Sequence, residues 1–193
     1  WVYGAVKIVM LALPLLAIMV GWKSGAFLKG TRWYDVVIGL VLGAIFFAAI
    51  FGTFRFFPEL FAKAFDGALT RAQAFGIATP SIFIVVGLLF AVFHSLFEEF
   101  YWRWFVFGAL RSLSLRSIAI PLSGFVFALH HVIILVAFTT PFLALLFGFL
   151  VGAIGSLWSF LYDRRGNITA AWISHLLADL AIVSAAFVIL FGT

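Results

Sequence analysis

Long apolar stretches follow one another along almost the whole chain, separated by short polar segments. Six of them approach or exceed the length of about 20 residues that a helix needs to cross the hydrocarbon of a bilayer. They cover residues 2–22, 36–56, 81–110, 118–138, 142–162 and 168–190. None shows the strict alternation of apolar and polar residues that is typical of a half-buried strand. The pattern therefore predicts an all-α, polytopic membrane helix bundle of about six transmembrane helices.

Small and capping residues lie where such helices would begin or pack together. Helix-start signals are present at three borders, Thr79-Pro80, Thr140-Pro141 and Gly166-Asn167. Two pairs of glycines are spaced four residues apart, Gly39 with Gly43 and Gly148 with Gly152. Because each pair leaves one helix face without side chains, we expect close helix–helix contacts at both.

The segment 58–75 is too polar to cross the bilayer. Apolar side chains such as Phe61 alternate here with polar ones such as Glu59, which favours one short helix in the membrane interface. The remaining loops are short, so we expect residues 1–193 to form a single transmembrane domain.

Composition supports a lipid environment. Hydrophobic residues make up 66% of the chain and charged residues only 10%, against about 45–50% and 25% in soluble domains. The net charge of +5 comes from basic residues scattered along the chain, so it indicates membrane anchoring and no nucleic-acid partner. There is no cysteine, which excludes disulfides, thiolate nucleophiles and cysteine-based zinc sites.

Basic residues also predict the orientation in the membrane. Seven lie in the first, third and fifth loops: Lys23, Lys29, Arg32, Arg111, Arg116, Arg164 and Arg165. Four lie on the opposite side: Lys7, Arg55, Lys63 and Arg71. Because basic loops stay in the cytoplasm, we expect both termini outside. The short loops favour a multi-pass protein of a bacterial plasma membrane.

Ionisable residues inside the predicted spans are the main functional signal. Each costs on the order of 2.5–3.5 kcal/mol near the bilayer centre, so it normally faces inward and has a partner or a function. All eight lie on the third, fourth and sixth stretches: His94, Glu98, Glu99, Arg103, His130, His131, His175 and Asp179.

Helical spacing and depth bring several of these residues together. Glu99 and Arg103 are four residues apart and can form an ion pair on one helix face. At 1.5 Å per residue, Glu98, His131 and His175 lie roughly 12–20 Å below the predicted cytoplasmic surface. We therefore expect one buried polar pocket that is open toward the cytoplasm.

Three motifs appear in order on these three stretches. They are Glu98-Glu99-Phe-Tyr-Trp-Arg103, Phe127-Ala-Leu-His-His131 and His175-Leu-Leu-Ala-Asp179. Together they resemble the EExxxR, FxxxH and His-xxx-Asn/Asp motifs of the CPBP family, the CAAX proteases and bacteriocin-processing enzymes, also called the Abi family. The resemblance covers a catalytic core of about residues 81–190.

The resemblance implies an intramembrane endopeptidase that cleaves near the C-terminus of its substrate. It assigns Glu98 as the general base, His131 as a second group that holds the attacking water, and His175 with Asp179 as the oxyanion site. An ionised Asp179 cannot donate a hydrogen bond to an oxyanion. We therefore interpret it as an acceptor that orients His175, with a protonated or metal-binding carboxyl group as the alternatives.

The other intramembrane polar residues are interpreted as support. By resemblance Glu99 and Arg103 brace the helix as an ion pair, and Phe127 is most simply a packing residue. His94 is interpreted as a helix-packing or hydrogen-bonding residue. His130 must point away from its neighbour His131 and is interpreted as structural.

No cofactor is expected, although a divalent metal is the alternative. Glu98, His131 and His175 are ligand types that suit zinc, but the HExxH motif is absent. The expected partners are the bilayer and a membrane protein or peptide, lipidated or with a C-terminal sorting tail. Two other functions stay open: a proton- or ion-coupled transporter that uses the same cluster, and a non-catalytic membrane scaffold or immunity protein.

Overall fold

The computed structural model describes residues 2–22, 30–61, 68–77 and 79–192, and these residues form helices and connecting turns without a strand. The elements are α1 (Val2–Met19), α2 (Trp33–Phe56), the 3-10 turn η1 (Pro58–Phe61), α4 (Ala68–Ala74), α5 (Pro80–Glu99), the π-helix η2 (Phe100–Phe107), α6 (Gly108–Leu113), α7 (Arg116–Leu135), α8 (Pro141–Arg165) and α9 (Thr169–Phe191). The predicted all-α bundle is confirmed.

Five helices of the described chain are long and apolar enough to cross a membrane, and a shorter apolar helix lies near the N-terminus. The second of these five is the longest: α5, η2 and α6 form one continuous helix of 34 residues from Pro80 to Leu113. Thr79 and Thr140 accept hydrogen bonds from the first turns of α5 and α8, as their capping positions predict.

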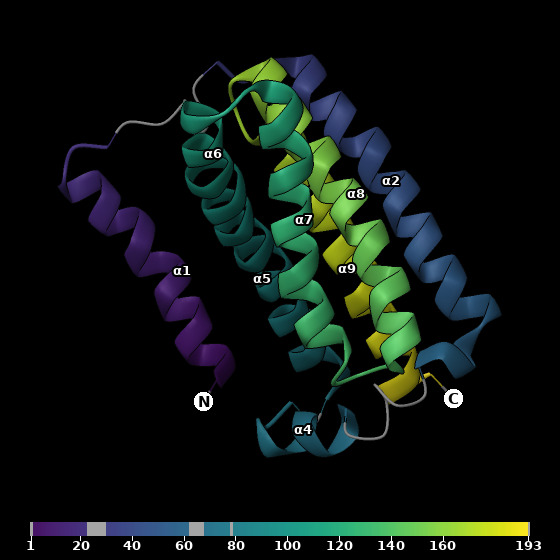
Figure 1. Ribbon diagram of the computed structural model, residues 1–193. Helices are drawn as coiled ribbons and strands as arrows, with labels where there is room; N and C mark the ends of the chain where they lie inside the picture. Colours follow the sequence, from purple (N-terminus) through teal and green to yellow (C-terminus); the bar gives the residue numbers. More distant parts are fainter. Residues whose placement is uncertain (1, 23–29, 62–67, 78, 193) are drawn as a thin grey trace.

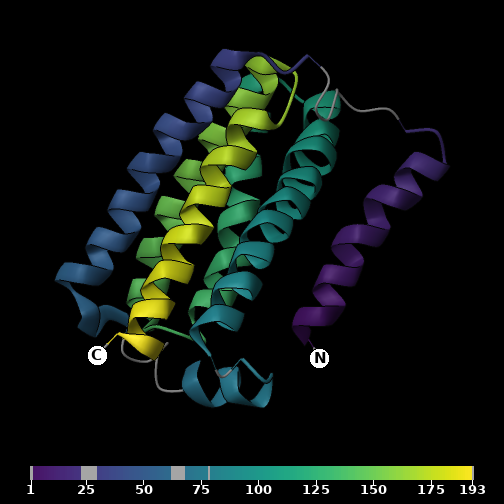
Figure 2. The same cartoon turned by 180° about the vertical axis from the view of Figure 1, so that it is seen from behind.

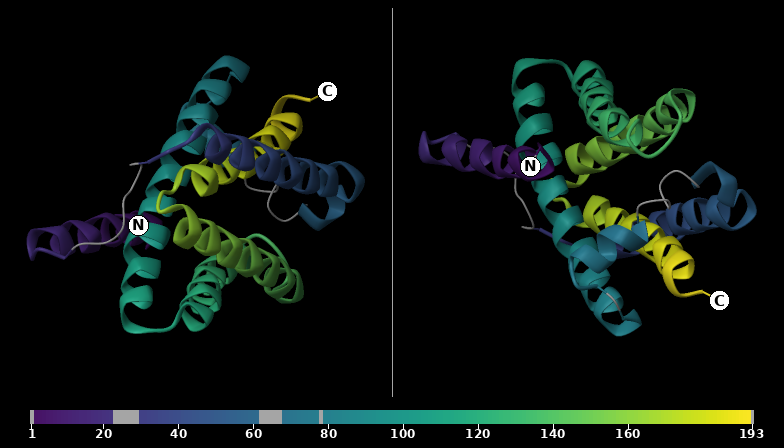
Figure 3. Two further views of the ribbon diagram at one scale, coloured as in Figure 1. Left: turned by 90° about the horizontal axis from the view of Figure 1, so that it is seen from above. Right: turned by 90° about the horizontal axis from the view of Figure 1, so that it is seen from below.

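The helices are arranged around the long α5–α6 helix. α2 packs on α9, α7 packs on α8, and α5 also contacts α9. Viewed along the bundle, the pairs α2–α9 and α7–α8 diverge from one side of the long helix, and α1 lies on its other side (Figure 3). α1 stands apart from the other helices over much of its length (Figures 1 and 2).

The predicted glycine contacts are confirmed. A Cβ atom at any of the four positions would lie less than 3.0 Å from a side chain of the neighbouring helix. The pairs are Gly39 with Ile173, Gly43 with Leu177, Gly148 with Val132 and Gly152 with Ala128. The first two join α2 to α9 and the last two join α8 to α7. Small residues therefore allow close packing in both helix pairs.

The segment that was expected in the interface is described only in part. It contains η1 and the short helix α4, which lies across one end of the bundle (Figure 1). Residues 62–67, including Lys63, lie outside the described residues.

Arginines gather at the opposite end of the bundle. Arg111 and Arg116 place their Nε atoms 3.1 and 2.8 Å from the two carboxylate oxygens of Asp163. Arg165 pairs with the buried Asp35 at the start of α2. Lys23 and Lys29, on which the predicted orientation also rests, lie outside the described residues.

Gly124→Ala is expected to destabilise the bundle by about 1–3 kcal/mol, because overpacking forces the backbone to shift. The new Cβ atom would lie 2.5 Å from the carbonyl oxygen of Gly152, and a carbonyl in a packed helix cannot rotate away. The thermal unfolding midpoint in detergent micelles measures this. Gly52→Ala is the control, since nothing lies within 4 Å of its Cβ position and alanine favours a helix. Equal midpoints for the two variants would contradict the close α7–α8 contact.

Candidate active site

The acidic pair lies near the middle of the longest helix, at a change in helical geometry. Glu98 and Glu99 end α5, and the π-helix η2 begins at Phe100. At its far end the backbone N–H of Gly108 bonds the carbonyl of Arg103, five residues earlier. The sequence predicted a regular helix here. The wider π-helical turn was not predicted from the sequence, and such turns occur frequently at functional sites.

Glu99 lies between the side chains of Arg103 and His175. Its Oε2 accepts a hydrogen bond from Arg103 Nε at 2.9 Å, and its Oε1 lies 2.9 Å from His175 Nδ1 on α9. Both Glu99 and Arg103 are fully buried. The ion pair that the spacing predicted is therefore present, and Glu99 also links the long helix to His175 on α9.

Arg103 continues this network to α8. Its Nη1 donates to the carbonyl of Gly155 and to Ser159 Oγ, both at 3.1 Å. The guanidinium carbon also lies 4.8 Å from the ring centre of Phe127 on α7. The buried guanidinium of Arg103 thus contacts residues of α5, α7 and α8, and it holds these helices together around the acidic pair.

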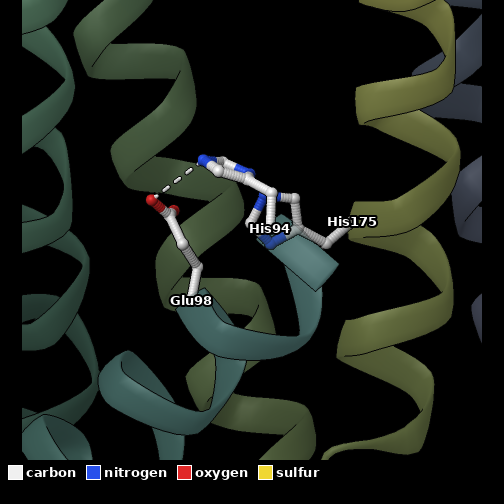
Figure 4. Close-up of side chains that lie close together, drawn as sticks. All are labelled: His94, Glu98 and His175. Carbon is white, nitrogen blue, oxygen red and sulfur yellow. Dashed lines mark ion pairs between the residues drawn. The ribbon is translucent and has the colours of Figure 1, made fainter. Parts of the chain in front are cut away.

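Glu98 faces a separate set of partners. His94, one turn earlier, places Nε2 3.3 Å from Glu98 Oε1, and its Nδ1 lies 3.1 Å from Asp179 Oδ2. Asp179 Oδ1 in turn lies 3.7 Å from His175 Nε2. Figure 4 shows the side chains of His94, Glu98 and His175 converging between the helices.

Helix α7 contributes its two histidines and Phe127. His130 Nε2 lies 3.7 Å from Glu98 Oε1. His131 Nδ1 lies 3.0 Å from the carbonyl of Phe127, and the two rings are 4.3 Å apart. Phe127 also borders His175, with ring centres 6.4 Å apart. His130 and Phe127 therefore lie beside residues of α5 and α9, and the predicted catalytic residue His131 packs against Phe127 and His130.

The structure brings together more residues than the sequence interpretation assigned. His130 was interpreted as structural, yet its Nε2 lies 3.7 Å from Glu98 Oε1. His94, interpreted as a helix-packing or hydrogen-bonding residue, pairs with Glu98 one turn away on the same helix. Asp179 was expected to orient His175, but the shorter carboxylate contact of His175 is with Glu99. Asp179 makes its own shorter contact with His94. The i to i+4 spacing of His94 and Glu98 was the available signal.

Three side chains among the described residues form a group that could hold a metal ion. His94, Glu98 and His175 each offer one ligand atom, and these atoms lie within 4.8 Å of one another. The second nitrogen of each imidazole contacts a carboxylate, as is usual for zinc-binding histidines. This donor set suits zinc, and it contains His94 where the sequence suggested His131.

An apolar cavity adjoins the site. It has a volume of about 380 Å³ and lies between α1 and α5. Met10 and Leu11 of α1 and Phe93 and Phe97 of α5 are among its lining residues, and His94 is its one polar lining residue in the described part of the chain. A substrate segment in this cavity would therefore meet the site at His94.

This geometry can support hydrolysis. A buried carboxylate flanked by imidazoles can remove a proton from water, and nearby cationic groups can stabilise a developing oxyanion. Neither a GxSG serine motif nor a cysteine is present in the sequence, so an acyl-enzyme through those nucleophiles has no support.

Part of the chain matches a known protein family. Residues 79–181 match the family described as type II CAAX prenyl endopeptidase Rce1-like. No curated protein and no solved structure matches the chain. The matched range contains every ionisable residue of the site, from His94 to Asp179.

Arg103→Met is expected to destabilise the protein by about 3–5 kcal/mol, because it leaves a buried carboxylate short of its cation. The added substitution Glu99→Gln should recover part of this loss, since it removes the unpaired charge. The measurement is the unfolding midpoint of both single variants and of the double variant. Arg111→Met removes an exposed ion pair and should cost less than about 1 kcal/mol. Additive effects of the two buried substitutions would contradict the coupling.

Proposed function

Because this chain belongs to the Rce1-like family of type II CAAX prenyl endopeptidases, we propose that it cleaves a membrane-associated peptide or protein near its C-terminus with a water molecule activated by Glu98. It is a multi-pass, membrane-embedded protease of the CAAX type. Family membership favours this function over the transporter and the scaffold. The observation that carries the proposed mechanism is Glu98 Oε1, buried between His94 Nε2 and His130 Nε2.

Glu98 is the proposed general base. Its side chain is only 1% exposed, so bulk water does not compete for the proton that it removes. The attacking water binds beside Oε1, and His131 helps to orient it, as the family resemblance implies. As the water oxygen attacks the scissile carbonyl carbon, its proton passes to Glu98.

His175 is the proposed donor to the oxyanion. Its Nδ1 lies 2.9 Å from Glu99 Oε1, and its Nε2 lies 3.7 Å from Asp179 Oδ1. In the proposed mechanism His175 is doubly protonated, so that Nδ1 donates to Glu99 and Nε2 donates to the oxyanion. A cation fixed where negative charge develops lowers the barrier by a few kcal/mol.

Access and orientation complete the proposal. The end of the bundle with Arg111, Arg116 and Arg165 faces the cytoplasm, following the distribution of basic residues. The active-site pocket around Glu98 opens toward the cytoplasm. The membrane is a bacterial plasma membrane. The substrate carries a lipidated or sorting tail, and the apolar walls of the cavity between α1 and α5 suit such a tail.

A zinc-dependent version of the same reaction is the second candidate. The observation that favours it is the grouping of ligand atoms from His94, Glu98 and His175. A bound divalent cation would polarise the scissile carbonyl and acidify a water molecule.

Glu98→Gln is expected to abolish cleavage, because an amide cannot accept the proton of the attacking water. C-terminal proteomics of cells that lack the gene identifies the peptides that are no longer trimmed. Wild-type protein should restore their trimming and Glu98→Gln should not. Glu59→Gln, on the exposed 3-10 turn, is the matched control and should restore it. Trimming restored by Glu98→Gln would contradict the assigned base.

Chelation separates the two versions of the mechanism. With Glu98 and water alone, dialysis of the purified protein against a zinc chelator should leave cleavage unchanged, and metal analysis should find far less than one zinc per chain. Loss of cleavage that returns with added zinc would instead establish the metal-dependent version.

A further inference from the structure

His94 has two carboxylate partners from different helices. Nδ1 lies 3.1 Å from Asp179 Oδ2 on α9, and Nε2 lies 3.3 Å from Glu98 Oε1 on its own helix. The ring is otherwise well packed, stacked on Phe90 with centres 4.6 Å apart. Asp179 therefore fixes which nitrogen of His94 faces Glu98.

Peptide hydrolysis requires a proton donor that the proposed function does not yet assign. When the C–N bond breaks, the leaving nitrogen must receive a proton, because an amide anion is too basic to leave. Glu98 holds a proton at that stage, after removing it from water. A group in contact with Glu98 and with the leaving segment could carry this proton between them.

We propose that His94, held by Asp179, carries the proton from Glu98 to the leaving nitrogen of the substrate. This inference rests on the proposed function. His94 begins with its proton on Nδ1, donated to Asp179. After the water has attacked, Nε2 takes the proton from Glu98, and the imidazolium is stabilised by the Asp179 carboxylate. Nε2 then gives this proton to the leaving nitrogen as the C–N bond breaks.

The step balances, since one water and one peptide bond give one carboxyl group and one amine. Glu98 ends as a carboxylate and His94 as a neutral ring, so both are ready for another cycle. In serine-protease triads an aspartate likewise orients a histidine and stabilises its imidazolium.

Position distinguishes His94 from the other imidazoles. His94 is the polar residue in the wall of the apolar cavity between α1 and α5, from which a membrane-bound substrate would approach. His130 lies farther from Glu98 Oε1, at 3.7 Å, and His175 Nδ1 is bound by Glu99. His94 alone of these three combines a contact with Glu98, an aspartate partner and an open side.

The test compares an amide with an ester at the scissile bond. The probe is a farnesylated peptide that ends in Cys-Val-Ile-Met, and the second probe has an ester in place of the Cys-Val amide. An alkoxide leaves without prior protonation, so the ester does not depend on a proton donor. His94→Gln should lower kcat for the amide by about 10²- to 10⁴-fold and kcat for the ester by less than about tenfold.

Matched variants make the result specific. Ser95→Ala changes the next residue, whose hydroxyl bonds only backbone carbonyls of its own helix, and should preserve both activities. Asp179→Asn keeps the contact but removes the charge, so it should raise the ester-to-amide ratio at least tenfold. This second variant decides the question if His94→Gln does not fold.

Other outcomes overturn the inference. Equal losses on both probes in folded His94→Gln would assign His94 to general positioning or to the oxyanion. Loss of a bound zinc in this variant would make it a ligand. An unchanged amide rate would remove it from the mechanism. By contrast, wild-type protein that cleaves neither this probe nor any C-terminal peptide in cells would overturn the proposed function itself.

Discussion

The site depends on one buried charge, the carboxylate of Glu99. An ion removed from water is costly unless its partners are close and well oriented, and both Glu99 oxygens have such partners. Arg103 takes one and His175 the other. Because Arg103 also bonds α8 and His175 belongs to α9, satisfying this carboxylate requires three helices to assemble in one register.

Glu98 is the neighbouring residue, yet its surroundings are different. Among the described contacts, Glu98 Oε1 lies beside the imidazoles of His94 and His130. A guanidinium stays charged and holds its carboxylate permanently, whereas an imidazole can exchange a proton near neutral pH. Two adjacent carboxylates thus have different environments: Glu99 joins the helices, and Glu98, beside two imidazoles, is the one to which we assign proton transfer.

Much of this could be predicted from the sequence, because the signals are local. Run length predicted the helices, the spacing of Gly39 and Gly43 predicted a close helix contact without identifying its partner α9, and the spacing of Glu99 and Arg103 predicted the ion pair. These features require only the periodicity of one helix.

The parts that could not be predicted depend on contacts between helices. His94 and Asp179 are separated by 85 positions, and no spacing rule relates residues on different helices. His130 was assigned away from the site because neighbours on a helix diverge by about 100°, but Glu98 lies close enough to be reached by His130 even so. The π-helix has no compositional signature that would separate it from its α-helical flanks.

The π-helix sets the rotation of residues 108–113 relative to residues 80–99, and the composition of the segment does not reveal this. A wide turn accommodates extra chain within a helix, so residues 80–99 and 108–113 do not share one continuous helical wheel. Closing this wide turn to a regular α-helix absorbs the deletion of a single residue between 100 and 107, whereas the same deletion within regular α-helix rotates everything beyond it by about 100°. An alignment that shifts a gap by one position within this segment would therefore misplace Arg103, even though every residue around it is equally apolar.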